Sequence, residues 1–124
     1  MIPRTLDVPL KPKTYAYGKA FEHFIITEIF RLNSYFRKNF RMSYLLTKDG
    51  AEINLILERP GKPLALIEIE STDNVTDRHI KHIQRFAKDI PNSKAFCLSK
   101  ETHPRKVGSV RILPWQQGIK EIGL

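Results

Sequence analysis

The chain has 124 residues, enough for one hydrophobic core, and we expect a single domain. Hydrophobic residues make up 41% of it, which excludes a disordered chain. No apolar run approaches the roughly 18–20 residues that span a bilayer, so no membrane partner is expected. The net charge of +8 predicts a polyanionic partner or a solvated basic surface. The N-terminus lacks a signal-peptide pattern and the one cysteine, Cys97, cannot pair within the chain, which predicts a cytoplasmic location.

The first expected elements are an extended segment and a helix. Residues 1–14 contain three prolines and no hydrophobic period, which predicts an extended lead-in to a domain at residues 15–124. From Gly18 to about Phe36, apolar residues recur near the 3.6-residue period of a helix. The phenylalanines of this helix, at positions 21, 24 and 30, are expected in the core.

Three strands joined by tight turns follow the helix. Apolar, β-branched patterns predict strands at residues 41–47, 51–58 and 64–70. The turns between them contain Lys-Asp-Gly at residues 48–50 and Arg-Pro-Gly at residues 59–61. Connections this short predict a three-stranded meander.

The C-terminal half contributes one long helix, two strands and a short helix. Thr76 is a good N-cap for the long helix, which ends before Pro91. Strands are expected at residues 94–98 and 107–113, and Pro114 opens the terminal helix. The expected order is therefore α-β-β-β-α-β-β with a terminal helix, an α/β fold.

Acidic residues concentrate in the middle of a basic chain. Residues 49–77 hold seven acids and two bases, a net charge of −5. The other residues hold six acids and nineteen bases, a net charge of +13. An acidic centre of this kind suits a divalent metal ion within a surface that attracts polyanions.

Strand alternation predicts where these acids converge. It puts Glu52, Asn54 and Ile56 on one face of the second strand, and Glu68 and Glu70 on one face of the third. If the two strands pair, their polar faces meet. Converging carboxylates repel each other unless a cation neutralises them, and Mg²⁺ is held by oxygen ligands.

Glu22 borders the buried face of the first helix and could join this group. A salt bridge or an amphipathic boundary position explains any one of the five polar residues alone. Taken together, they favour a site.

Cationic side chains follow one face of the second long helix. They recur at i, i+3, i+4, i+7 and i+10, and they are Arg78, Lys81, His82, Arg85 and Lys88. Such a stripe can follow a phosphate backbone, and it is also typical of a solvated outer face. Arg105, Lys106 and Arg111 would extend the surface if they face the same way.

Four segments resemble a C-terminal domain that follows the ATPase module in a large group of prokaryotic AAA-type ATPases of uncharacterised function. They are GKAFEHFIITEIF, LLTKDGAEINLIL, PLALIEIEST and VRILPW, and the resemblance covers about residues 17–121. That domain is similar to the PD-(D/E)xK nuclease superfamily. The resemblance therefore implies a restriction-endonuclease-like fold, with a central mixed β-sheet flanked by helices, and an ATPase module in a longer parent protein. The P-loop motif is absent here, so we expect no ATPase activity from this chain.

The nuclease pattern implies a role for each polar position. Glu22 falls at its helix carboxylate, Asn54 at its strand-two aspartate, Glu68 at its strand-three glutamate and Glu70 at its lysine. Asn54 offers a neutral oxygen where a carboxylate holds the metal, and Glu70 replaces a cation. Glu52 could partly substitute for the aspartate, and Glu52 and Glu68 are the candidate ligands for Mg²⁺ or Mn²⁺.

Three functions stay open at this point. The first is a nucleic-acid-binding or regulatory module of an ATPase, with DNA favoured over RNA and a degraded nuclease site. The second is an active Mg²⁺-dependent nuclease, a phosphodiesterase that uses Glu22, Glu52, Glu68 and Glu70. The third is a protein-interaction domain only. Metal binding separates the second from the others, and salt-dependent DNA binding separates the first from the third.

Overall fold

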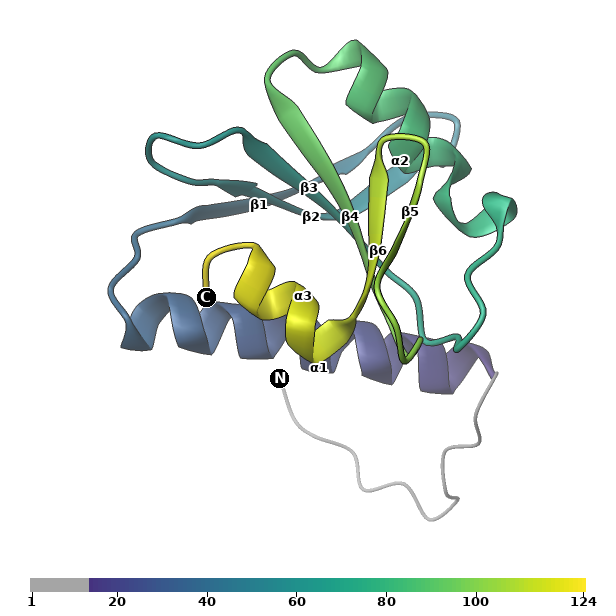
Figure 1. The fold of residues 1–124 in the computed structure, drawn as a ribbon, viewed down its shortest axis with the longest axis horizontal. Coiled ribbons are helices and arrows are strands. Elements are labelled where there is room, and N and C mark those ends of the chain that lie inside the picture. The colour runs from purple at the N-terminus through teal and green to yellow at the C-terminus, as the bar shows by residue number, and fades with distance from the viewer. Residues whose placement is uncertain (1–13) are drawn as a thin grey trace.

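A computed structural model describes residues 14–124 (Figure 1). The elements in chain order are α1 (Tyr15–Tyr35), β1 (Arg41–Leu46), β2 (Glu52–Glu58), β3 (Leu64–Ile69), α2 (Asp77–Asp89), β4 (Ser93–Ser99), β5 (Arg105–Val107), β6 (Val110–Pro114) and α3 (Trp115–Glu121). The lead-in predicted for residues 1–14 lies outside the described residues except for Thr14. The Thr14 hydroxyl accepts a hydrogen bond from the Tyr17 N–H at 3.1 Å and so caps α1.

The strands form one mixed sheet of six strands in the order β1-β2-β3-β4-β6-β5. The first three make the predicted antiparallel meander, whereas β3, β4 and β6 run parallel. Helix α2 provides the long crossover that parallel pairing of β3 with β4 requires. The expected α/β fold, with a mixed sheet flanked by helices, is confirmed at this level.

The order of elements differs from the prediction after β4. The single strand expected at residues 107–113 is wrong, because the structure has a hairpin of β5 and β6 with a two-residue turn at Gly108 and Ser109. Gly108 has a positive φ of 58°, which glycine adopts without steric cost. A Gly-Ser pair inside an apolar run is a hairpin signal in its own right.

The core has two halves, one on each face of the sheet. Helices α1 and α3 cover one face, where Ile25 and Ile29 pack against Leu55, Leu57 and residues of β3 and β4. Helix α2 covers the other face through Ile80, Ile83 and Phe86. Figure 1 shows α1 and α3 together on one side of the strands and α2 on the other.

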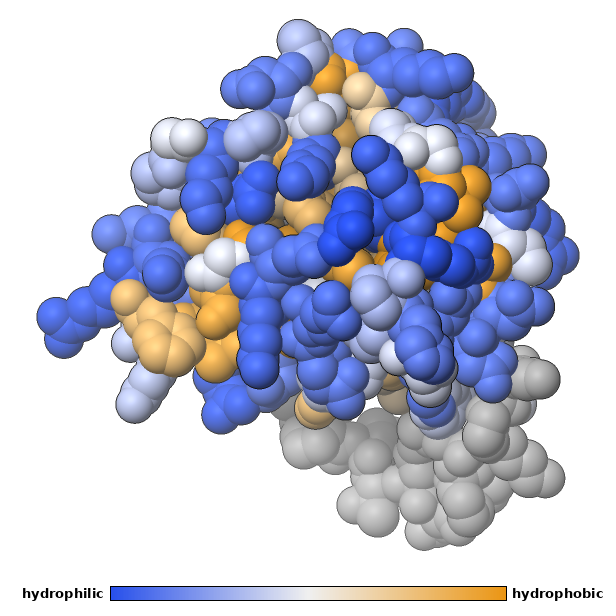
Figure 2. Space-filling model, viewed as in Figure 1, coloured by the Kyte–Doolittle hydropathy of each residue, from blue (hydrophilic) through white to orange (hydrophobic). Residues whose placement is uncertain are grey.

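The outer side of α1 departs from the predicted core. Phe24 is 47% exposed and Phe30 is 63% exposed, so their assignment to the core is wrong, while Phe21 is partly buried. Phe24 instead packs edge-on against Trp115 of α3, with ring centroids 5.4 Å apart. Elsewhere hydrophilic side chains cover most of the face seen in Figure 2, with hydrophobic residues in separate patches between them. None of the helices in residues 14–124 is both long and apolar enough to cross a membrane.

Gly118 allows α3 to approach the sheet closely. A Cβ atom at this position would lie 2.0 Å from Leu98 Cδ2, whereas a Cβ at Gly18 of α1 would lie 3.6 Å from Ser71 Oγ. We expect Gly118→Ala to destabilise the fold by about 1–3 kcal/mol, because overpacking outweighs the better helix propensity of alanine. Gly18→Ala is the matched control and should stabilise by roughly 0.5–1 kcal/mol. Urea unfolding followed by circular dichroism measures both, and equal effects would contradict the packing argument.

Candidate functional site

The structure brings the predicted polar residues to one cavity, which we call the carboxylate pocket. Its volume is about 190 Å³. Its lining includes Glu22 of α1, Glu52 and Asn54 of β2, Glu68 of β3, and Glu70, which directly follows β3. Glu22 reaches it from the face covered by α1, while Glu70 lies 4.0 Å from His79 of α2. The pocket is therefore reached from both faces of the sheet.

The pocket forms where β2 and β3 stop pairing. Their ladder ends at Leu55 and Ile67. One position further along, the Asn54 Oδ1 accepts a hydrogen bond from the backbone N–H of Ile69 at 2.8 Å. The amide side chain thus satisfies a β3 donor that a regular ladder would have paired with the β2 backbone.

A β-bulge between β1 and β2 turns Asn54 toward the point where β2 and β3 stop pairing. Ser43 pairs with Ile56 and Leu45 pairs with Ile53, so two residues of β2 oppose the single residue Tyr44. Such a bulge re-aims side chains. The predicted alternation is therefore partly wrong, since Ile56 packs on the α2 face instead of sharing a face with Asn54.

Asn54 also holds Glu22. The Asn54 Nδ2 donates a hydrogen bond to Glu22 Oε2 at 2.9 Å, and Lys19 Nζ lies 3.4 Å from Glu22 Oε1. An aspartate at position 54 could not make this contact, because it has no N–H donor and would face a second carboxylate. The asparagine therefore joins β2 to α1 by a direct hydrogen bond between side chains. Lys19, which sequence analysis missed, precedes Glu22 by one helical turn, a spacing that signals a pair.

Glu68 is the most perturbed acid of the pocket. Burial raises its pKa to about 10, and a hydrogen bond with Glu70 and the negative charges of Glu70, Glu52 and Glu22 act in the same direction. At neutral pH the Glu68 carboxyl is therefore protonated. It can donate its proton in a hydrogen bond to Glu70, which removes one of the converging negative charges.

His79 of α2 faces Glu70 from the cavity next to the carboxylate pocket, and sequence analysis did not place it there. Its Nδ1 accepts a hydrogen bond from the Thr76 N–H at 2.9 Å, which leaves the proton of the neutral ring on Nε2, the atom that faces Glu70. The position of His79 three residues after the N-cap Thr76 is the only signal in the sequence.

The arrangement of side chains in the carboxylate pocket is unfavourable for binding a divalent cation. Across residues 14–124, no three His, Cys, Asp or Glu side chains are arranged to hold a metal ion together. Metal ligands must be deprotonated, so a cation would have to displace the proton of Glu68. It would also compete with the Asn54 amide for Glu22. Binding of Mg²⁺ or Mn²⁺ by Glu52 and Glu68 stays a prediction.

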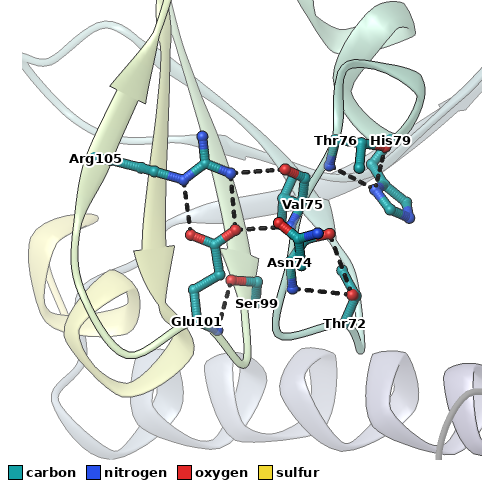
Figure 3. A network of polar contacts seen from close by, with 8 residues as sticks. All are labelled: Thr72, Asn74, Val75, Thr76, His79, Ser99, Glu101 and Arg105. Atoms are coloured by element: carbon teal, nitrogen blue, oxygen red, sulfur yellow. Dashed lines mark hydrogen bonds and ion pairs between the residues drawn. The ribbon is translucent and has the colours of Figure 1, made fainter.

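A polar network fixes the loop that carries Glu70 toward α2 (Figure 3). Glu101 accepts two hydrogen bonds from Arg105 at 2.8 Å and one from the Val75 N–H at 2.7 Å. Arg105 also donates to the Val75 carbonyl at 2.7 Å. The pKa of Glu101 is lowered by the Arg105 hydrogen bond, so the pair stays charged. Arg105 therefore stabilises a loop and is not free to extend the basic surface.

The cationic stripe of α2 lies on the outer face of the helix, as predicted. Its five residues are Arg78, Lys81, His82, Arg85 and Lys88, and all are exposed. Arg78 also lines a second cavity, which shares Tyr15, Glu70 and Ser71 with the carboxylate pocket. The stripe thus begins beside the pocket, and its binding of nucleic acid stays a prediction.

Residues 17–117 match a family described as "Domain of unknown function (DUF4143)". The chain belongs to this family. DUF4143 domains are uncharacterised and often occur with ATPases, which confirms that part of the resemblance found in the sequence. No curated protein matches the sequence.

The hydrogen bond between Asn54 and Glu22 can be tested by moving the carboxylate from position 22 to position 54. Asn54→Asp should destabilise this DUF4143 domain by about 1–3 kcal/mol at neutral pH, because it removes a donor and adds a like charge. The double variant Glu22→Gln with Asn54→Asp restores a donor opposite a carboxylate, and it should recover most of the loss. Urea unfolding of the four proteins in the cycle gives the coupling free energy. Additive effects would contradict the proposed bridge.

Glu68 should make stability fall as pH rises. The folded state keeps a proton on Glu68 that the unfolded chain releases above about pH 4.5. The contribution of Glu68 to the free energy of unfolding is therefore full below pH 4.5 and is lost toward pH 10. Glu68→Gln removes this dependence. Between pH 5 and 9 the free energy of unfolding of the variant should rise relative to that of the native protein, by up to about 1.4 kcal/mol per pH unit. Partial exposure of the Glu68 side chain to solvent makes the change smaller than this upper value. Glu58→Gln, at an exposed site on β2, is the control, and parallel stability curves for all three proteins would contradict the protonated state.

Proposed function

We propose that this DUF4143 domain is a nuclease-like nucleic-acid-binding or regulatory module of an ATPase, with a degraded active site. The mixed sheet flanked by helices, and the grouping of Glu22, Asn54, Glu68 and Glu70 around one pocket, support the proposal. Asn54 and Glu70 are the two residues that are unfavourable for cleavage. DNA is the preferred ligand. The observation that carries the proposal is the Asn54 bridge between Glu22 and Ile69, which engages both polar atoms of the amide within the fold.

The chemistry of the pocket supports loss of efficient cleavage. Hydrolysis of a phosphodiester at such a site needs ionised oxygen ligands and a positive charge near the developing negative charge. Here Glu68 is protonated and Asn54 uses both of its polar atoms within the fold. Glu70 brings a negative charge to the position of the cation. Each of these features opposes the transition state.

The surface beside the pocket supports binding instead. Arg78, Lys81, Arg85 and Lys88 face solvent from one helix, which begins beside the carboxylate pocket. A polyanion can follow this helix while its backbone phosphates exchange counterions for protein cations. A module that binds nucleic acid without cutting it could report the bound state to an attached ATPase, which is the regulatory part of the proposal.

A binding titration with charge-reversed variants tests the proposed function. We expect the domain to bind labelled duplex DNA weakly and with little sequence preference, and binding should weaken as salt rises. Lys81→Glu, Arg85→Glu and Lys88→Glu combined should weaken it several-fold, because each lost phosphate contact flattens the salt slope by about one unit. The control combines Arg31→Glu, Lys38→Glu and Arg41→Glu, which changes the net charge equally at exposed positions elsewhere. Fluorescence anisotropy at low salt measures all three proteins.

Two results would overturn the proposal. Absence of binding to duplex and single strands would leave a protein-interaction domain as the better explanation. Robust cleavage of DNA in Mg²⁺ or Mn²⁺ by the native chain, abolished by Glu68→Ala, would show that the site is an active nuclease. In that case Glu52 or Glu70 would have taken the role of the missing aspartate.

A further inference from the structure

Another cavity, separate from the carboxylate pocket and from the cavity lined by Arg78, lies at the other end of α2 and is lined mainly by positive charge. It has a volume of about 560 Å³, within the range of ligand sites. Ala87 of α2 and Glu121 of α3 both line it, so it reaches around the end of the sheet from one face to the other. We call it the basic cavity, because Lys94, Lys106 and Arg111 line it.

Its three cations come from three neighbouring strands. Lys94 lies on β4, Arg111 on β6 and Lys106 on β5, and these strands are adjacent in the sheet. Lys106 and Arg111 are direct partners across the β5–β6 hairpin. Like charges placed directly opposite each other destabilise a pair of strands. The arrangement therefore costs stability unless an anion neutralises it.

The fold supplies only part of that neutralisation. Glu121 binds the Arg111 guanidinium through two hydrogen bonds, one of them from Nε at 3.0 Å, which use two of its five N–H donors. Within residues 14–124, neither Lys94 nor Lys106 forms an ion pair. The Lys94 ammonium lies 5.8 Å from the centre of the Phe96 ring, which holds its stem against the sheet. Three cations and one carboxylate leave the cavity with two uncompensated positive charges.

We propose that the basic cavity binds phosphate groups of the same nucleic acid that α2 contacts. The identity of this polyanion rests on the proposed function, whereas the affinity for phosphate rests on the cavity itself. Helix α2 has 13 residues and is therefore about 20 Å long. Its stripe begins beside the carboxylate pocket with Arg78 and ends with Lys88, one residue after Ala87 of the basic cavity. A bound strand would thus extend from α2 over the end of the sheet to Lys94 and Lys106.

Neutral variants isolate the contribution of the cavity. The variant Lys94→Gln with Lys106→Gln removes two phosphate contacts, which should lower the slope of log affinity against log salt by about 1.8 for duplex DNA. The ratio of native to variant affinity should then change about tenfold between roughly 50 and 200 mM salt. The control, Lys38→Gln with Arg41→Gln, loses the same charge at exposed positions outside the cavity and should keep the native slope.

A second measurement tests the cavity without DNA. Tripolyphosphate should raise the melting temperature of the native protein and of the control at matched ionic strength, but not that of the cavity variant. If the native protein binds DNA and the cavity variant matches the control, the inference is overturned while the proposed function stands. If the native protein binds no DNA, the proposed function fails. A tripolyphosphate effect that depends on Lys94 and Lys106 would then assign the cavity to a free phosphate ligand, and absence of that effect would overturn the inference entirely.

Discussion

The Asn54 amide is the contact on which the carboxylate pocket depends. It joins α1, β2 and β3 at the point where the two strands separate, by donating to Glu22 and accepting from Ile69. A neutral amide is suited to this position because it can do both at once. An aspartate there would need a cation to hold Glu22, so the choice of residue at position 54 decides whether the protein alone holds Glu22 in place.

The acids around this bridge are stable together only because their charge is reduced. Glu68 keeps its proton, Glu22 is paired with Lys19, and His79 presents an N–H to Glu70. A metal-binding site would reach neutrality in another way, by binding a divalent ion between ionised carboxylates. The fold instead satisfies the polar groups of the pocket internally.

Much of the fold could be predicted from the sequence because its signals are local. The meander follows from two glycine turns with positive φ at Gly50 and Gly61, and α2 follows from the Thr76 cap and its apolar stripe. The hairpin of β5 and β6 was missed because its two turn residues interrupt an apolar run that looked continuous. The orientation of Ile56 depends on a bulge, which alternation cannot reveal, and the position of His79 depends on how α2 packs against β3.

The charged residues of α2 can be explained by the stability of the helix or by a bound anion. The charged residues of the neighbouring strands distinguish these two explanations. Asp77 in the first turn and Lys88 in the last complement the helix dipole, worth about 0.3–1 kcal/mol each, so the stability of the helix accounts for them. Helix stability does not explain Lys94, Lys106 and Arg111, which belong to three strands and line a common cavity. Their mutual repulsion stabilises nothing in the fold. An anion bound beside them would relieve that repulsion, which is why the basic end of the sheet points to a ligand more directly than the stripe on the helix does.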